Sequence, residues 1–172
     1  MKIAIVLPLV FSSALLAQMQ MPKPAPELKK LDYFVGTWKT EADMKASPYG
    51  PGGKMTSTDH VEWMQGNFFM LIHTQFTGGT TSGMEVAVLG YDSAKNAYTY
   101  SSYNSMGEHE TATGTVDGDT WTWNSESSGA PGNMKWRFIE KIVSPTSYTM
   151  KFEMAPDGST WSTVMEGKAT KQ

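Results

Sequence analysis

Residues 31–40 read LDYFVGTWKT, and this stretch decides the fold. Apolar spacing typical of a helical turn ends at Val35, Gly36 interrupts it, and a run with strand character opens at Thr37. Gly36 allows a sharp backbone change that a side chain would resist. Trp38, if it faces inward, supplies the largest apolar surface on which the floor of a barrel can pack. The stretch therefore predicts a short helix that caps one end of a β domain.

The N-terminus has the pattern of a secretory signal peptide. A basic start precedes an apolar run, residues 3–17, which is shorter than the roughly 20 residues of a membrane-spanning helix. We therefore expect residues 1–17 to be a signal peptide cleaved near Ala17, and the mature protein to be exported to the periplasm or the medium. We expect residues 18–26 to be a proline-containing linker and residues 27–172 to form one β-barrel domain.

The composition excludes several classes of function. The count of Cys 0 leaves no disulfide, thiolate nucleophile or cysteine metal site. The formal net charge is -3 and the lysines are scattered, with Arg137 as the single arginine, so the chain has no basic surface for nucleic acid. Hydrophobic residues make up 40% of the chain, so stability rests on the burial of one core.

The rest of the chain shows about ten short strands separated by turn residues, and no second helical pattern. Such consecutive antiparallel strands expose costly edges unless the sheet closes. We therefore predict an all-β fold, an up-and-down antiparallel barrel with a short N-terminal capping helix over residues 27–34. A barrel of this strand number has room for a ligand. The longest break, residues 47–53, is a candidate lid. The predicted strands are 37–45, 54–65, 68–77, 83–91, 97–104, 107–116, 120–126, 134–143, 148–154 and 160–170.

Several motifs follow one another in a fixed order. They are Gly36-Thr37-Trp38 in the first strand, Gly90-Tyr91-Asp92 with Tyr98, Arg137 in a late strand, and Pro156-Asp157-Gly158 before the last strand. This series resembles an uncharacterised bacterial family of exported, lipocalin-like (calycin superfamily) β-barrel proteins. The resemblance spans residues 27–171 and implies a barrel without an assigned function. In lipocalins the signature tryptophan packs against a late-strand arginine, which assigns these parts to Trp38 and Arg137.

Two similar barrels suggest ligands. Nitrobindins hold haem through a histidine in a late strand, and fatty-acid-binding proteins hold a carboxylate with inward arginines. The present chain has no histidine after His109, so the comparison with nitrobindins fails at the haem ligand. Among arginines, only Arg137 can hold a ligand carboxylate.

A hairpin turn at Gly66-Asn67 makes His60 and His73 cross-strand neighbours. With Glu62 on the same face, these side chains form a candidate site for zinc, copper or iron. The opposite face of the hairpin is the more apolar one and should be buried. We therefore expect the histidines to look outward, with a metal site or a ligand contact as the alternatives.

The carboxylates offer no pair that spacing alone assigns to acid–base catalysis. Glu108 and Glu110 share one face of a strand, whereas Glu62 and Glu85 stand alone. Serines are plentiful, but Gly-x-Ser-x-Gly does not occur. We assign no catalytic residue, and we expect these carboxylates on solvated strand faces, because charged residues are mostly exposed.

Aromatic and methionine residues recur at period two along the later strands, which places each set on one face. In a small barrel this pattern is shared by the solid core and by the lining of a cavity, so both interpretations stay open. Methionine is an adaptable lining, and tyrosine hydroxyls can orient a ligand. The candidate ligand-binding residues are Trp38, Tyr98, Tyr100, Trp121, Trp123, Trp136, Arg137, Phe152 and Trp161.

These observations predict an exported barrel that binds or carries a small apolar or amphipathic molecule. One alternative is a haem- or metal-dependent enzyme on the same barrel, with His60 or His73 as ligand or base. Another is a filled barrel that acts as an interaction module through its outer surface. The sequence indicates no nucleic-acid partner and no membrane span after residue 17.

Overall fold

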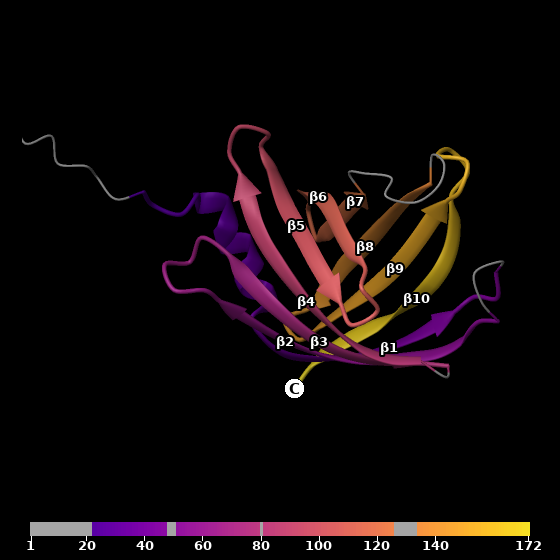
Figure 1. Ribbon diagram of the computed structural model, residues 1–172. Coiled ribbons are helices and arrows are strands. Elements are labelled where there is room, and N and C mark those ends of the chain that lie inside the picture. The colour runs from indigo at the N-terminus through magenta and orange to yellow at the C-terminus, as the bar shows by residue number, and fades with distance from the viewer. Residues whose placement is uncertain (1–21, 48–50, 80, 126–133) are drawn as a thin grey trace, which may run out of the picture.

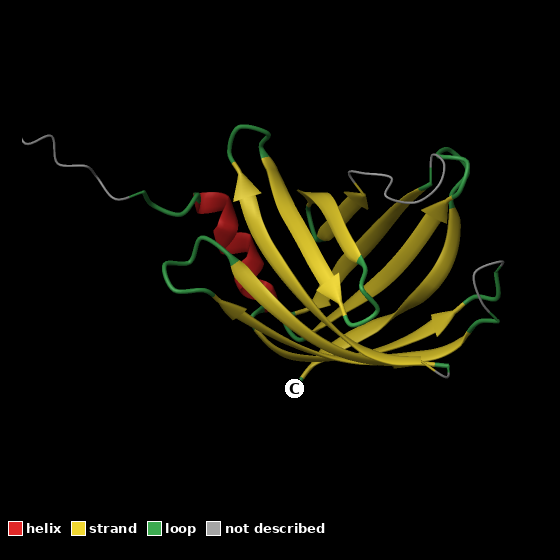
Figure 2. Cartoon of the chain, viewed as in Figure 1, coloured by secondary structure: helices red, strands yellow, loops and turns green. Residues whose placement is uncertain are grey.

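The computed structural model describes residues 22–47, 51–79, 81–125 and 134–172 (Figures 1 and 2). The signal peptide predicted at residues 1–17 lies outside the described residues. In these ranges the chain forms one short helix and ten strands. The elements are η1 (Pro26–Phe34), β1 (Gly36–Met44), β2 (Gly53–Trp63), β3 (Met70–Gly78), β4 (Thr81–Asp92), β5 (Ala97–Asn104), β6 (His109–Asp117), β7 (Thr120–Ser125), β8 (Lys135–Ser144), β9 (Ser147–Ala155) and β10 (Ser162–Lys171).

The ten strands close into a single barrel in chain order. Each strand pairs antiparallel with its neighbours, and β1 completes the ring by pairing with β10, where Trp38 faces Lys171. Closure removes the free strand edges that an open meander would expose. The predicted all-β, up-and-down antiparallel barrel is therefore confirmed.

The helix η1 lies across one end of the barrel (Figure 2). Its apolar side chains Leu28, Leu31 and Phe34 are buried and belong to the core of the barrel. Pro26 occupies the start, where its fixed φ and missing N–H suit a helix. The predicted capping helix is present, begins one residue earlier than expected and is wound as a 3-10 helix. Within the described residues, no helix has the length and apolar character needed to cross a membrane.

Side chains of the barrel wall donate hydrogen bonds to η1 and fix it in place. These buried or half-buried donors are thereby satisfied, as a folded interior requires. The helix is therefore an integral part of the barrel rather than a loose flap. The bonds run from Tyr98 Oη to Glu27 O (2.8 Å), from Trp63 Nε1 to Asp32 Oδ1 (2.9 Å) and from Trp38 Nε1 to Phe34 O (2.6 Å).

The β2–β3 hairpin has the register that its turn predicts. Gly66 and Asn67 both have positive φ, 94° and 58°, as the tight turn requires. His60 pairs with His73 across the two strands, so the predicted register is confirmed. Both histidines are exposed on the outer wall, because side chains alternate between the two faces of a strand.

Candidate functional site

The barrel encloses a cavity of about 480 Å³. Its lining reaches from Phe34 of η1 to Asn104 and Met106 near the β5–β6 connection. The volume falls in the range of small-molecule sites, which runs from about 300 to 1,000 Å³. The interior is therefore not filled by side chains, which removes the filled barrel considered from the sequence.

The end of the cavity next to η1 is a cluster of aromatic rings, here called the aromatic floor. Phe34, Trp38 and Tyr148 line the cavity there, and the ring centroids of Trp38 and Tyr148 are 5.0 Å apart. Tyr98 and Trp121 pack beneath them with centroids 4.7 Å apart. Trp38 is 1% exposed. The indole predicted to close the floor does so.

Three carboxylates project into this cavity, which is otherwise mainly apolar. They are Asp59 on β2, Glu85 on β4 and Glu140 on β8. Glu108 and Glu110 line it as well and are exposed. No lysine, arginine or histidine is among the lining residues in the part of the chain that the structure describes. The charges that face the cavity are therefore all negative.

Hydroxyl groups hold the carboxylate of Asp59. Thr74 Oγ1 donates to Oδ1 at 2.7 Å, Ser57 Oγ donates to Oδ2 at 3.1 Å, and Thr40 Oγ1 donates to Oδ2 at 3.4 Å. Burial raises the pKa of Asp59 and outweighs these hydrogen bonds, which lower it. The hydroxyls therefore orient the carboxylate without neutralising its charge.

Glu140 is the most deeply buried of the three. Its side chain accepts a hydrogen bond from Trp123, with Nε1 and Oε2 3.0 Å apart. Burial raises the pKa of Glu140 to about 7, against the lowering effect of that hydrogen bond, and the nearby charge of Asp59 raises it further. At neutral pH the group therefore lies near its titration midpoint.

Glu85 is influenced both by the buried Asp59 and by the exposed Glu108. Tyr100 Oη donates to Glu85 Oε1 at 2.9 Å. Burial raises the pKa of Glu85, the hydrogen bond from Tyr100 lowers it, and the charges of Asp59 and Glu108 raise it again. The carboxylates thus influence one another through the cavity they share.

Comparison with the sequence models of known families identifies the family of this chain. The sequence model of the family described as "Protein of unknown function (DUF1579)" matches residues 23–171. The chain belongs to the DUF1579 family. A comparison with curated proteins finds no match.

Solved structures similar to this DUF1579 barrel share its fold at low identity. Rv2717c from M. tuberculosis has 14% identity and a TM-score of 0.62, over 87% of this chain and 99% of that chain. The S-type phycobiliprotein lyase CPES from Guillardia theta has 8% identity and a TM-score of 0.57, over 84% of this chain and 91% of that chain. These similarities show a calycin-like barrel, the fold predicted from the motif series.

The DUF1579 barrel separates the predicted ligand-binding residues into three groups. Tyr98 and Trp121 pack in the aromatic floor below the cavity. Arg137 and Trp161 lie together on the outer wall. Those that line the cavity are Trp38, Tyr100, Trp123, Trp136 and Phe152.

The predicted packing of Arg137 against Trp38 is wrong. Both neighbours of Arg137 along β8 line the cavity, so the alternation of a strand turns Arg137 outward. Its guanidinium carbon lies 4.3 Å from the ring centroid of Trp161, and its Nε donates to Glu153 Oε2 at 2.5 Å. Lys171 takes the place expected for the arginine, with Nζ 5.3 Å from a ring centroid of Trp38.

The histidines of the DUF1579 barrel are not in the cavity. His60, His73 and His109 are all exposed, and so is Glu62. Within the described residues, no group of three or more His, Asp or Glu is arranged to hold a metal ion. The candidate metal site at His60, Glu62 and His73 is therefore not formed. His60 and His73 also do not reach a ligand inside the barrel.

Sequence reasoning missed the carboxylates of the cavity. Glu85 was expected on a solvated face and instead lines the interior, and Asp59 and Glu140 were not singled out. The signal was present, because Glu140 follows Trp136 and Phe138 at intervals of two residues. The prediction instead followed the general rule that charged residues are exposed. That rule fails for these carboxylates because the interior of the barrel is hollow.

Gly114 leaves the space that the indole of Trp123 occupies. A Cβ atom at this position would lie 2.4 Å from the ring atom Cζ3 of Trp123. The substitution Gly114→Ala should push the indole away from Glu140 and lower the free energy of unfolding by about 1–3 kcal/mol. Urea unfolding checks this, with Thr115→Ala, on the outer face of the same strand, as the control. Equal stability of the two variants would contradict the packing described here.

Proposed function

We propose that the protein binds a small apolar or amphipathic molecule inside the barrel. The observation that carries the proposal is the cavity of about 480 Å³, which is lined by aromatic and methionine side chains together with a few polar groups. Such a combination is typical of small-molecule sites, where apolar surface provides affinity and the polar groups fix orientation. We also propose that the protein acts after export, on the basis of the signal-peptide pattern of residues 1–17.

The two ends of the barrel support entry from one side. The helix η1 covers one end, and the connection between β5 and β6 lies toward the other (Figure 1). Met106, in that connection, lines the cavity and is 54% exposed, so it borders the mouth. A ligand would enter there and place its apolar part toward the aromatic floor.

A haem- or metal-dependent enzyme has less support. Its proposed ligands His60 and His73 are exposed on the outer wall and do not face the cavity. A phycobiliprotein lyase has the same fold, so an enzyme can be built on this architecture, but at 8% identity this similarity concerns the fold alone.

The proposal is tested with Nile red, a neutral fluorescent probe of apolar sites. The purified protein should enhance and blue-shift Nile red emission. Ala87 is 1% exposed and lines the cavity, so Ala87→Phe should fill part of it and weaken probe binding by about tenfold or more. Val88→Phe, one residue along β4 on the outer face, is the matched control. Absent enhancement with the unmodified protein, or equal loss in both variants, would contradict binding in the barrel.

A further inference from the structure

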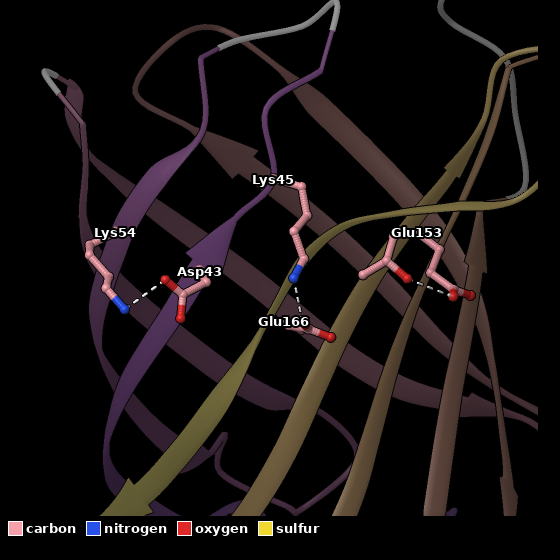
Figure 3. A network of polar contacts seen from close by, with 6 residues as sticks. Asp43, Lys45, Lys54, Glu153 and Glu166 are labelled. Atoms are coloured by element: carbon pink, nitrogen blue, oxygen red, sulfur yellow. Dashed lines mark hydrogen bonds and ion pairs between the residues drawn. The ribbon is translucent and has the colours of Figure 1, made fainter.

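The deep carboxylates of the cavity, Asp59, Glu85 and Glu140, form no ion pair with any Lys, Arg or His that the structure describes. Among the described residues, the ion pairs are formed by other groups, and Figure 3 shows those of β1, β2 and β8–β10. The chain therefore pairs several of its other acidic side chains but leaves the interior ones unpaired. The pairs are Lys45–Glu166, Lys54–Asp43, Lys95–Asp92 and Arg137–Glu153.

Glu140 shows the contrast most clearly. It is 8% exposed, and Glu153, the cross-strand pairing partner of Arg137, is 9% exposed. Glu153 has the guanidinium of Arg137 beside it, whereas Glu140 faces the cavity with one hydrogen bond from Trp123. Removing a charge from water without a counter-ion is costly, so a bound cation would relieve that cost.

The carboxylates stand on opposite walls of the cavity. Asp59 and Glu85 flank Thr74 in one cross-strand row, because Thr74 pairs with both. Glu140 lies on β8, which is four strands from β2 in one direction round the barrel and six in the other. A positive group inside the barrel would therefore have negative charge on more than one side.

The surroundings fit an organic cation better than a bare metal ion. In the described residues no three His, Asp or Glu come together as metal ligands. Beside Glu140 the wall is aromatic, with Trp123 on β7 and Trp136 and Phe138 on β8 among the lining residues. Aromatic faces attract ammonium groups and also bury hydrocarbon. A molecule with an amine at one end and an apolar body satisfies both parts of the lining.

We propose that the ligand of this cavity is an amphipathic organic cation, an amine whose positive charge is balanced by the carboxylates of Asp59, Glu85 and Glu140. The inference rests on the proposed function, because it names the chemical class of the molecule that the same cavity takes. Glu108 and Glu110, exposed at the mouth, add negative charge along the entry path and would attract such a cation.

The test is displacement of Nile red by three molecules with the same ten-carbon chain: decylamine, decan-1-ol and decanoate. Decylamine should displace the probe from the unmodified protein at least about tenfold more effectively than decan-1-ol, because hydrogen bonds to charged groups exceed neutral ones. Decanoate should be the weakest. Equal potency of decylamine and decan-1-ol, or stronger displacement by decanoate, overturns the inference while Nile red binding leaves the proposed function standing. Failure of Nile red to bind overturns both.

Two variants locate the charge recognition. Asp59→Asn and Glu140→Gln keep the size of each side chain and remove its negative charge. Each should reduce the advantage of decylamine over decan-1-ol, and the double variant, which leaves Glu85 as the remaining deep carboxylate, should reduce it further. Glu153→Gln is the control, because this carboxylate is equally buried but points away from the cavity. An unchanged advantage in the double variant overturns the inference, and the ligand series with the unmodified protein decides it if a variant fails to fold.

Discussion

Replacing Trp38 by alanine is expected to lower the free energy of unfolding by about 3–5 kcal/mol. The indole is 1% exposed, lies against Tyr33 and Tyr148 with ring centroids 5.4 Å and 5.0 Å away, and donates a hydrogen bond to Phe34 O. The substitution therefore removes a large buried surface and a link between η1 and β1. Urea unfolding followed by circular dichroism measures the loss.

Trp161→Ala is the matched control for this experiment. Trp161 is only half-buried, and its ring lies against the guanidinium of Arg137 on the outer wall. Its removal should cost no more than about 1.5 kcal/mol, the scale of a partly exposed cation–π contact with modest burial. Similar losses from Trp38→Ala and Trp161→Ala would contradict the role of Trp38 in the aromatic floor.

Glu140→Gln is expected to stabilise the protein at pH 8 by up to about 3 kcal/mol and to change little at pH 4. The ordinary pKa of a glutamate is 4.5, and burial raises that of Glu140 to about 7. Between these values the folded state binds more protons than the unfolded state. Stability from this group is therefore present below 4.5, is lost as the pH rises to about 7, and stays lost above it.

Glutamine keeps the acceptor for Trp123 Nε1 but carries no charge at any of these pH values. The measurement is urea unfolding of both proteins at pH 4, 6 and 8. Glu153→Gln is the control, since it breaks the salt bridge to Arg137 and should destabilise the protein at pH 8. A loss of stability in Glu140→Gln at pH 8 would show that the charged carboxylate of Glu140 has a stabilising partner in the folded protein.

The two properties of Glu140 are connected. The charged carboxylate of Glu140 destabilises the ligand-free protein at neutral pH, and a bound cation would offset this cost of burial. Functional sites commonly lower the stability of a protein in this way. Glu140→Gln should therefore give a more stable protein with a weaker preference for decylamine. The stability measurement and the displacement measurement are independent, so each can fail without the other.

The candidate site was only partly accessible from the sequence. The period of two placed Trp123, Trp136 and Phe152 correctly on inward faces. The same rule turns Arg137 outward, but the resemblance to lipocalins had assigned it to Trp38. The position of Lys171 over that ring follows from the pairing of β1 with β10, the first and last strands of the barrel. The predicted closure implies that pairing, but no local pattern gives the register that sets Lys171 opposite Trp38.

By itself, the sequence determined the closed antiparallel barrel, its capping helix and the register of the β2–β3 hairpin. These follow from local chemistry: Pro26 at a helix start, Gly36 at a sharp turn, and side-chain alternation along each strand. The tertiary structure alone decided that the interior is hollow and acidic. Asp59 and Glu140 lie on strands far apart in the chain, and they face one cavity only because the sheet closes and brings their walls round the same space.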